Sequence, residues 1–380
     1  MADANPERDV VEYLAGLSAD ERSAAYARIN DGLKLKLPTD EADPPPPVHK
    51  FRDYRTMEIA EPPSLISDGQ VVRGEITVNI GRAGKGKTTL LTNRMMQWSA
   101  GLPLFDGLEN SQVPTEPLRM LLIENEGSGF YMQESLQKLY DHIAISEEAK
   151  EAADENLMVW GDGGYSGLKV DRESDMLIVK RALSENPVDV LLLEPFRGIW
   201  TGDENDNSAV EQVLDSLVAL AHEFNCGIML SHHANKSPIE DGEFMSAARG
   251  ATALEGKVAT MEYFREVRDG EQRELKWTKQ RYGRKQAPVR MEYDFDTRSY
   301  AWVPDSEIEK LVLQLMVQDD PPQWWSKSQI SEEIGEPAAK IGKALDSLKD
   351  QGRVVQRRKE QTQFFKVKTD EGENGEGLSI

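Results

Sequence analysis

Residues 76–89 read ITVNIGRAGKGKTT, a short β-branched run followed directly by a glycine-rich loop. From Gly81 to Thr88 the loop matches G-x-x-x-x-G-K-[ST], the pattern of a phosphate-binding P-loop. In such a loop the glycines let consecutive backbone N–H groups turn toward phosphate oxygens. A helix beginning there points its positive end at the anion. The stretch therefore predicts a nucleoside-triphosphate site between a strand and a helix.

Each position of the loop has an expected role. We expect the Lys87 ammonium to bind the β- and γ-phosphate oxygens, and the Thr88 hydroxyl to bind Mg²⁺. The predicted nucleotide-binding residues are Gly81, Arg82, Ala83, Gly84, Lys85, Gly86, Lys87, Thr88 and Thr89. No adenine-contacting motif is evident, so the base is open and ATP with Mg²⁺ is the expected cofactor pair.

Composition restricts the class of protein. The 380 residues carry a net charge of −22, which argues against attraction of the whole surface to nucleic acid or anionic lipid. Any DNA contact must then come from local basic segments. One cysteine, Cys226, excludes an intramolecular disulfide and fits a reducing compartment. No long apolar stretch and no basic leader is present, so we expect a cytoplasmic protein that does not contact membranes.

Composition and periodicity divide the chain into five parts. Residues 1–37 have helical patterns, and residues 38–49 form an acidic, proline-rich linker. Residues 50–304 alternate strands with helices and end in four short strands. This order predicts an α/β core with a mainly parallel sheet and an antiparallel extension. Residues 305–368 show three helices and then two strands, the order of a winged helix, and residues 369–380 resemble a disordered acidic tail.

Two acids follow predicted strands, at the edge where ligands of parallel sheets bind. Glu126 comes after the strand at 119–124, where a carboxylate can polarise a water for attack on the γ-phosphate. The alternative is a helix N-terminal charge. Glu194 ends the strand at 188–193, where an acid typically supports Mg²⁺, partly through a water. The alternative there is a structural carboxylate.

A third strand, at 227–231, ends in the polar sequence HHANK. A side chain at this point can contact the γ-phosphate and move the following segment when the phosphate leaves. We assign this role to His232, with a structural histidine as the alternative. Two adjacent histidines without a further ligand nearby argue against a metal site.

These motifs together resemble the RepA-like hexameric ATPases of plasmids and phages, relatives of the DnaB-type helicases with the RecA fold. The resemblance spans about residues 63–303 and includes ARGATAL at 248–254. Its most specific element is Lys279-Gln-Arg281-Tyr-Gly283, which is similar to a K-x-R-x-G turn. The resemblance implies that Lys279 and Arg281 act across a subunit interface on the neighbour's γ-phosphate, stabilising transition-state charge. The alternative is a solvated basic hairpin.

The resemblance also implies a homo-oligomer, a hexameric ring, that holds single-stranded DNA in its channel and works with replication or recombination proteins. The corresponding loops lie near 197–208, which is acidic, and 236–249. A second basic cluster lies in the predicted winged helix and consists of Lys349, Arg353, Arg357, Arg358, Lys359, Lys366 and Lys368. The predicted DNA contacts are Lys236, Arg249, Arg353, Arg357, Arg358 and Lys359. Protein docking is an open alternative for the cluster, and solvated charge is one for Lys236.

The leading interpretation is an ATP-hydrolysing ring that moves on single-stranded DNA in phage or plasmid replication, as a helicase does. A filament-forming recombination ATPase would use the same fold and site, and an ATP-switched DNA-binding regulator is a third interpretation. Three features depart from the resembled family: glutamate at position 194 where aspartate is usual, no amino-terminal collar, and the acidic total charge.

Overall fold

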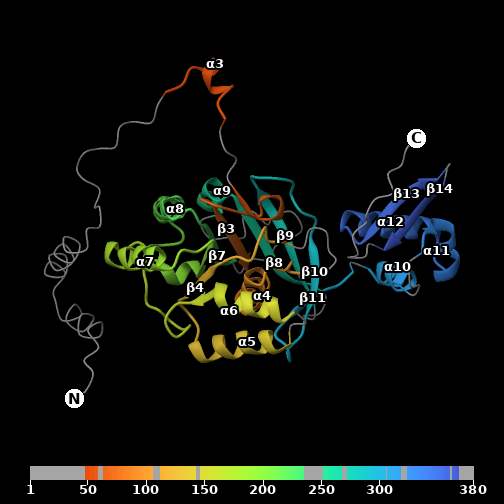
Figure 1. Cartoon of the computed structure of the whole chain (residues 1–380), viewed down its shortest axis with the longest axis horizontal. Coiled ribbons are helices and arrows are strands. Elements are labelled where there is room, and N and C mark those ends of the chain that lie inside the picture. Colours follow the sequence, from red (N-terminus) through yellow and green to blue (C-terminus); the bar gives the residue numbers. More distant parts are fainter. Residues whose placement is uncertain are drawn as a thin grey trace. The chain divides into compact units, whose positions relative to one another are not determined.

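The computed structural model describes residues 48–58, 63–105, 112–142, 146–234, 251–267, 272–304, 306–317, 323–359 and 362–367 (Figure 1). The chain divides into two compact units, residues 1–61 and 62–380. In the first unit the structure describes a short helix, α3 (Phe51–Tyr54), with no buried residue. The predictions for residues 1–47 and for the tail lie outside the described residues, and the predicted domain boundaries stay predictions.

The second unit is built on a nine-stranded sheet, counted over the described residues, with the order β11-β10-β9-β8-β3-β7-β6-β4-β5. Its strands are β3 (Ile76–Gly81), β4 (Met120–Glu124), β5 (Leu157–Val159), β6 (Val190–Glu194), β7 (Gly227–His233), β8 (Thr260–Val267), β9 (Gln272–Gln280), β10 (Val289–Tyr293) and β11 (Tyr300–Trp302). The six strands β8, β3, β7, β6, β4 and β5 pair in parallel, and β9, β10 and β11 add antiparallel pairs. This arrangement confirms the α/β class with a mainly parallel sheet and an antiparallel extension.

Two strands of the nine-stranded sheet differ from the expectation. The run that forms β8 was expected in the antiparallel extension, but β8 pairs with β3 in parallel. The reason is that helix α9 (Ala251–Lys257) comes between β7 and β8 in the chain, and a crossover of this kind returns the chain in the same direction. The strand β5 was not predicted, because three residues are too few to show a period.

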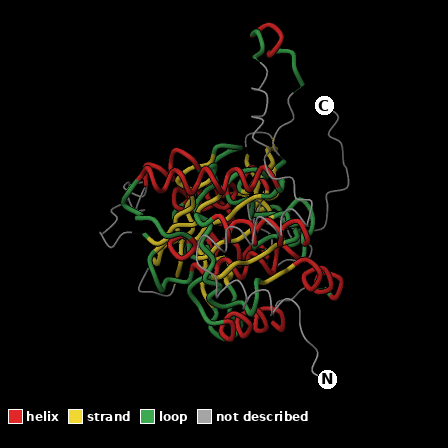
Figure 2. The backbone as a smooth tube through the Cα atoms, turned by 90° about the vertical axis from the view of Figure 1, so that its left-hand side faces the viewer, coloured by secondary structure: helices red, strands yellow, loops and turns green. Residues whose placement is uncertain are grey.

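Helices cover both faces of the sheet (Figure 2). On one face lie α4 (Lys87–Ser99), α5 (Gly129–His142) and α6 (Glu147–Asn156); on the other lie α7 (Glu173–Glu185), α8 (Asn207–Glu223) and α9. Alternate strand residues serve the two cores: Ile123 and Leu193 face α8, whereas Leu122 and Leu192 face α4. The strands β1 (Ser64–Ile66) and β2 (Val71–Val72) form a hairpin around the turn η1 (Ser67–Gly69). This hairpin packs into the apolar core on the α4 face.

The remainder of the described chain has its own apolar core. Its elements are α10 (Glu307–Val317), β12 (Trp325–Ser326), α11 (Lys327–Ile334), α12 (Ala338–Asp350), β13 (Val354–Lys359) and β14 (Thr362–Val367). The strands pair in the order β12-β14-β13, around buried residues such as Met316, Ile341 and Leu345. The strand β12 is an addition to the expected elements. The winged-helix interpretation stays a prediction. We call this part the C-terminal unit.

No helix in the described ranges has both the length and the apolar character needed to cross a bilayer.

A buried ion pair joins the P-loop strand, its helix and β8. The Arg94 Nη2 atom of α4 lies 2.8 Å from Glu262 Oε2 of β8, and both side chains are almost fully buried. Asn79 of β3 and Gln112 also donate to the Glu262 carboxylate, at 3.2 and 3.1 Å. The network therefore fixes α4 on the sheet beneath the loop.

Glu262→Gln should destabilise the protein by about 3–5 kcal/mol, because it leaves the Arg94 charge buried without its counter-ion. Urea unfolding gives this free energy. Asp215→Asn is the control, since it breaks the half-exposed Lys257 pair and should change stability little. Equal losses in the two variants would show that the buried pair does not hold α4.

Candidate functional site

The P-loop has the backbone conformation that its glycines permit. Gly84 and Gly86 have φ values of 69° and 95°, in the left-handed region that disfavours other residues. Gly86 is the residue from which α4 starts, so the amino end of the helix opens at the loop. The backbone N–H groups there have the position and the dipole that a phosphate requires.

Lys87 lies inside this loop. Its Nζ atom donates to the Arg82 carbonyl at 3.1 Å and lies 3.1 Å from His233 Nδ1. Burial lowers the pKa of Lys87, and the carboxylates of Glu194 and Glu126 oppose that shift. The ammonium is thus placed among the groups that follow three different strands.

Thr88 and Glu194 contact each other directly. The Thr88 hydroxyl donates to Glu194 Oε1 at 2.7 Å. Burial, together with the charge of Glu124, raises the pKa of Glu194 to about 7. Glu124 is the register neighbour of Glu194 in the next strand, and burial raises its pKa also. A hydroxyl beside two buried carboxylates is an all-oxygen set whose charge suits Mg²⁺.

Glu124 is a residue that the sequence interpretation missed. Its Oε1 atom accepts the backbone N–H groups of Glu126 and Gly127, both at 2.8 Å. These bonds hold the turn after β4. The exposed Glu126 carboxylate then lies 3.5 Å from His233 Nε2. The signal was present in the sequence, because Glu124 ends the apolar run MLLIE, as Glu194 ends VLLLE.

The structure places the two adjacent histidines on opposite faces of the sheet, so His232, to which the phosphate-sensing role was assigned, does not face the P-loop helix. His232 is buried on the α8 face, edge-on to Phe196, and lies 3.8 Å from Glu204 Oε1. His233 is on the α4 face, beside Lys87 and Glu126. Adjacent residues of a strand point to opposite faces, so only one of the pair can face the P-loop helix. The alternation of β7 contained this information, which the sequence interpretation did not use.

A cavity of about 310 Å³ adjoins the site. Its lining includes Thr88, Thr89, Glu124, Glu126, Tyr131, Glu194 and Arg298. Arg298 was not predicted; it follows β10 in a turn with a φ of 60°, and the Asn93 side chain of α4 donates to its carbonyl at 3.0 Å. One arginine and three carboxylates therefore line the same cavity.

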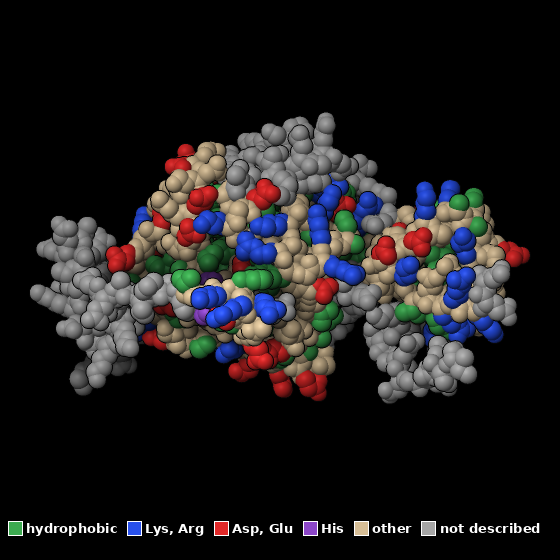
Figure 3. Space-filling model, turned by 90° about the horizontal axis from the view of Figure 1, so that it is seen from above, with side chains coloured by type: hydrophobic (Ala, Val, Ile, Leu, Met, Phe, Trp, Pro, Cys, Tyr) green, Lys and Arg blue, Asp and Glu red, His purple; other side chains and the backbone are tan. Residues whose placement is uncertain are grey.

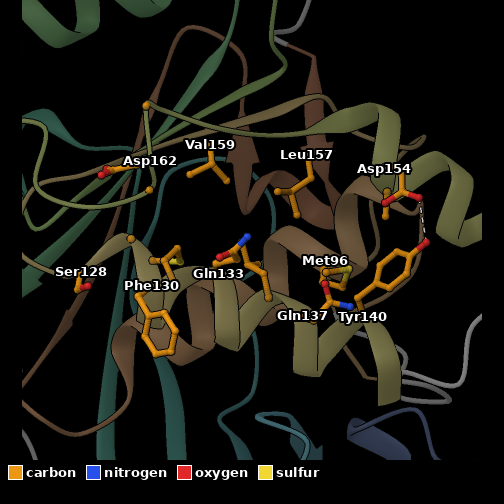
Figure 4. A pocket seen from close by; sticks show the side chains of 16 residues that line it. Met96, Ser128, Phe130, Gln133, Gln137, Tyr140, Asp154, Leu157, Val159 and Asp162 are labelled. Atoms are coloured by element: carbon orange, nitrogen blue, oxygen red, sulfur yellow. Dashed lines mark hydrogen bonds between the residues drawn. The ribbon is translucent and has the colours of Figure 1, made fainter.

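A larger cavity, of about 840 Å³, lies beside the edge strand β5. Figure 4 shows Phe130 and Gln133 of α5 and Val159 of β5 lining it, with a hydrogen bond of 2.9 Å from Tyr140 to Asp154 at one end. None of the P-loop residues lines this cavity.

Lys279 and Arg281 lie near the amino ends of the parallel strands, whereas the P-loop lies at their carboxyl ends. The Arg281 backbone N–H donates to Ala259 O, and the Ala259 N–H donates to Ile76 O, at the start of β3. The Arg281 guanidinium is partly exposed and lies 3.4 Å from Glu75 Oε2. Lys279 Nζ donates to the Glu255 carbonyl. Within one chain these cations therefore do not meet the groups around Lys87.

The predicted DNA contacts fall in two places. Lys236 and Arg249 lie outside the described residues. In the C-terminal unit Arg357, Arg358 and Lys359 are exposed along β13, and Figure 3 shows basic side chains on the surface of this unit. Arg353 differs, because its guanidinium packs over the Trp302 ring at 4.6 Å and is half-buried. Arg357 lies over Trp324 at 4.1 Å, so this tryptophan carries a cation on its face.

Comparison with known proteins places the chain. The model of a family described as "AAA domain" matches residues 39–238, more than half of the chain. The chain belongs to the AAA domain family. The matched range holds the P-loop, Glu126, Glu194 and His233, and the AAA domain makes this protein a P-loop ATPase. Lys279, Arg281 and the C-terminal unit lie beyond that range.

Among solved structures, the chain is similar to one titled "Crystal structure of the RadB recombinase". The two are 14% identical, the match covers 61% of this chain and 91% of that one, and the TM-score is 0.42.

Glu194→Gln should make the nucleotide-free protein more stable above neutral pH and change it little near pH 5. The raised pKa means that the wild-type loses stability as pH rises from about 4.5 to about 7, when the buried carboxyl ionises. The difference at pH 8 should reach about 3 kcal/mol, at about 1.4 kcal/mol per pKa unit. Urea unfolding at both pH values measures it. Glu185→Gln, on an exposed side chain, is the control; a Glu194→Gln effect independent of pH would refute the assignment.

Proposed function

We propose that this AAA domain ATPase is an oligomeric motor on single-stranded DNA, and that a neighbouring copy completes each catalytic site. The observation that carries the proposal is the position of Lys279 and Arg281 at the sheet edge opposite the P-loop. Glu126, Glu194 and His233 lie around Lys87 in the same chain.

The separation of the two edges supports action between copies. Between Ile76, beside Arg281, and Gly81, at the P-loop, β3 rises by roughly 16 Å at about 3.3 Å per residue. A single side chain does not span that length. A second copy could stack the amino ends of its parallel strands on the carboxyl ends of the strands of the first copy. This contact would bring Arg281 of the second copy to the cavity beside Thr88. Such a head-to-tail contact generates a closed ring or a helical filament.

The residues then have distinct roles in hydrolysis. The loop N–H groups and Lys87 bind the phosphates, while Thr88 and Glu194 hold Mg²⁺, the latter partly through water. A Mg²⁺ ion held there would supply positive charge that neutralises the phosphate oxygens. Glu126 orients and polarises the attacking water, and Glu124 holds the turn that carries Glu126. His233 contacts both Lys87 and Glu126. A γ-phosphate that binds these two groups would change their contacts with His233, and this change would be transmitted to β7, which carries His233.

For the biological role, the helicase-like hexameric ring is the leading candidate, and a recombination ATPase that forms filaments is the second. The K-x-R turn favours the ring. Negative-stain images with ATP and single-stranded DNA distinguish the two, and a forked-duplex assay tests strand displacement. Stimulation of turnover by one duplex sequence alone would instead favour the ATP-switched regulator.

Arg281→Ala should lower ATP turnover by about 10³-fold or more and leave nucleotide affinity near that of the wild type, because a cation supplied by a neighbour acts mainly on the transition state. Steady-state hydrolysis and equilibrium binding of a fluorescent ADP analogue measure the two effects. Arg284→Ala, an exposed arginine three residues along the same turn, is the matched control.

Mixing two inactive variants tests the sharing of the site. Lys87→Ala keeps the K-x-R turn, and Arg281→Ala keeps the P-loop. In randomly mixed oligomers about one quarter of the interfaces would combine both intact halves, so activity should return in part. If the mixture stays as inactive as its components, the two halves do not meet between copies.

A further inference from the structure

The P-loop is held from behind by the antiparallel extension of the sheet. Tyr300 of β11 is buried, and its hydroxyl donates to the Gly86 carbonyl at 3.3 Å. Arg273 of β9 donates through Nε to the Lys85 carbonyl at 3.0 Å. A Cβ atom added at Gly86 would lie 2.2 Å from the Tyr300 hydroxyl oxygen. The hydroxyl therefore occupies the space in which any other residue at 86 would place its side chain.

These bonds bear on phosphate binding through the geometry of the peptide group. The N–H and C=O of one peptide unit point in opposite directions, because the unit is planar and trans. A donor that fixes a loop carbonyl on one side orients the attached N–H toward the other side. Tyr300 and Arg273 hold two consecutive carbonyls of the loop, and the N–H groups of the same peptide units belong to Gly86 and Lys87.

Tyr300 is itself fixed by the P-loop helix and by aromatic neighbours. Its backbone N–H donates to Asn93 Oδ1 of α4 at 3.0 Å. Its ring is edge-on to Phe264 of β8, with centroids 5.8 Å apart, and tilted against Tyr293 at 5.2 Å. Burial raises the pKa of Tyr300, so its hydroxyl keeps the proton that it donates.

The same strand reaches the C-terminal unit two residues later. Trp302 lies on the same side of β11 as Tyr300, since side chains alternate along a strand. Trp302 packs against the apolar cluster of β8 to β11 and also against the core of the C-terminal unit. The Arg353 guanidinium covers its ring. One short strand thus contacts the nucleotide loop at one residue and the C-terminal unit at the next residue on that side.

We propose that Tyr300 is a positioning residue of the P-loop, and that β11 couples nucleotide binding to the C-terminal unit through Trp302 and Arg353. Nucleotide bound at the loop tightens the Tyr300 contact and, through β11, orders the packing at Trp302. A ligand that shifts the C-terminal unit changes the position of the loop by the same route. The inference rests on the proposed nucleotide site.

The first test is Tyr300→Phe in the full chain, which keeps the ring and removes the hydroxyl. Affinity for Mg·ADP, measured by displacement of a fluorescent analogue, should fall about five-fold, the effect of one neutral hydrogen bond. The matched control is Tyr140→Phe, which removes a tyrosine hydrogen bond outside the site. The melting temperatures of both variants without nucleotide show whether a loss of ADP affinity comes from the position of the loop or from lower overall stability. Equal ADP affinity in Tyr300→Phe and wild type overturns the positioning role.

The second test is hydrogen exchange with and without Mg·ADP. In the wild type, ADP should slow amide exchange in β11 and in α10 and β14 of the C-terminal unit as well as in the P-loop. In Tyr300→Phe and in Arg353→Met, at saturating ADP, protection should remain at the loop and be lost from the C-terminal unit. Wild-type protection confined to the core overturns the coupling. A wild-type chain that binds no ADP overturns the proposed function itself, which is a separate outcome.

Discussion

The start of α4 at Gly86 is the constraint on which the rest of the site depends. The left-handed conformation of Gly86 turns the chain from β3 into a helix on one face of the sheet. On the neighbouring strands, a last side chain that points to this face lies near the amino end of α4. Glu124, Glu194 and His233 arrive in this way from three strands, and Arg94 anchors the helix from below through Glu262.

This convergence places opposed charges in a buried space. Burial raises the pKa values of the two neighbouring carboxylates, Glu124 and Glu194; the charge of Glu126 adds to the shift at Glu124, and the charge of Glu124 adds to the shift at Glu194. Lys87 has a lowered pKa for the same reason of burial. The nucleotide-free site therefore keeps charged groups in an unfavourable state, which a divalent cation and phosphate oxygens relieve. The buried charged groups lower the stability of the nucleotide-free protein at the place where the ligands bind, and perturbed pKa values of this kind are common at functional sites.

The antiparallel extension contacts both ends of the parallel strands. At the carboxyl edge, Tyr300 and Arg273 hold the loop carbonyls, and Arg298 faces the cavity. At the amino edge, Lys279 and Arg281 face away from their own P-loop. In the proposed assembly of stacked copies, the extension would support the site of its own chain and contribute Lys279 and Arg281 to the site of a neighbouring copy.

The sequence by itself determined the P-loop, the α/β class, the strands β3, β4, β6 and β7, and the acids after them, because these depend on local pattern and on spacing along the chain. It missed β5, the parallel pairing of β8, and the groups Glu124, His233, Arg298 and Tyr300. Three features are set by packing of the whole sheet: the pairing direction of a strand, the face to which a strand residue points, and contacts between distant segments, such as that of Tyr300 with Gly86, 214 residues apart. Only the tertiary structure decided them, since no local periodicity encodes which distant segments share an edge.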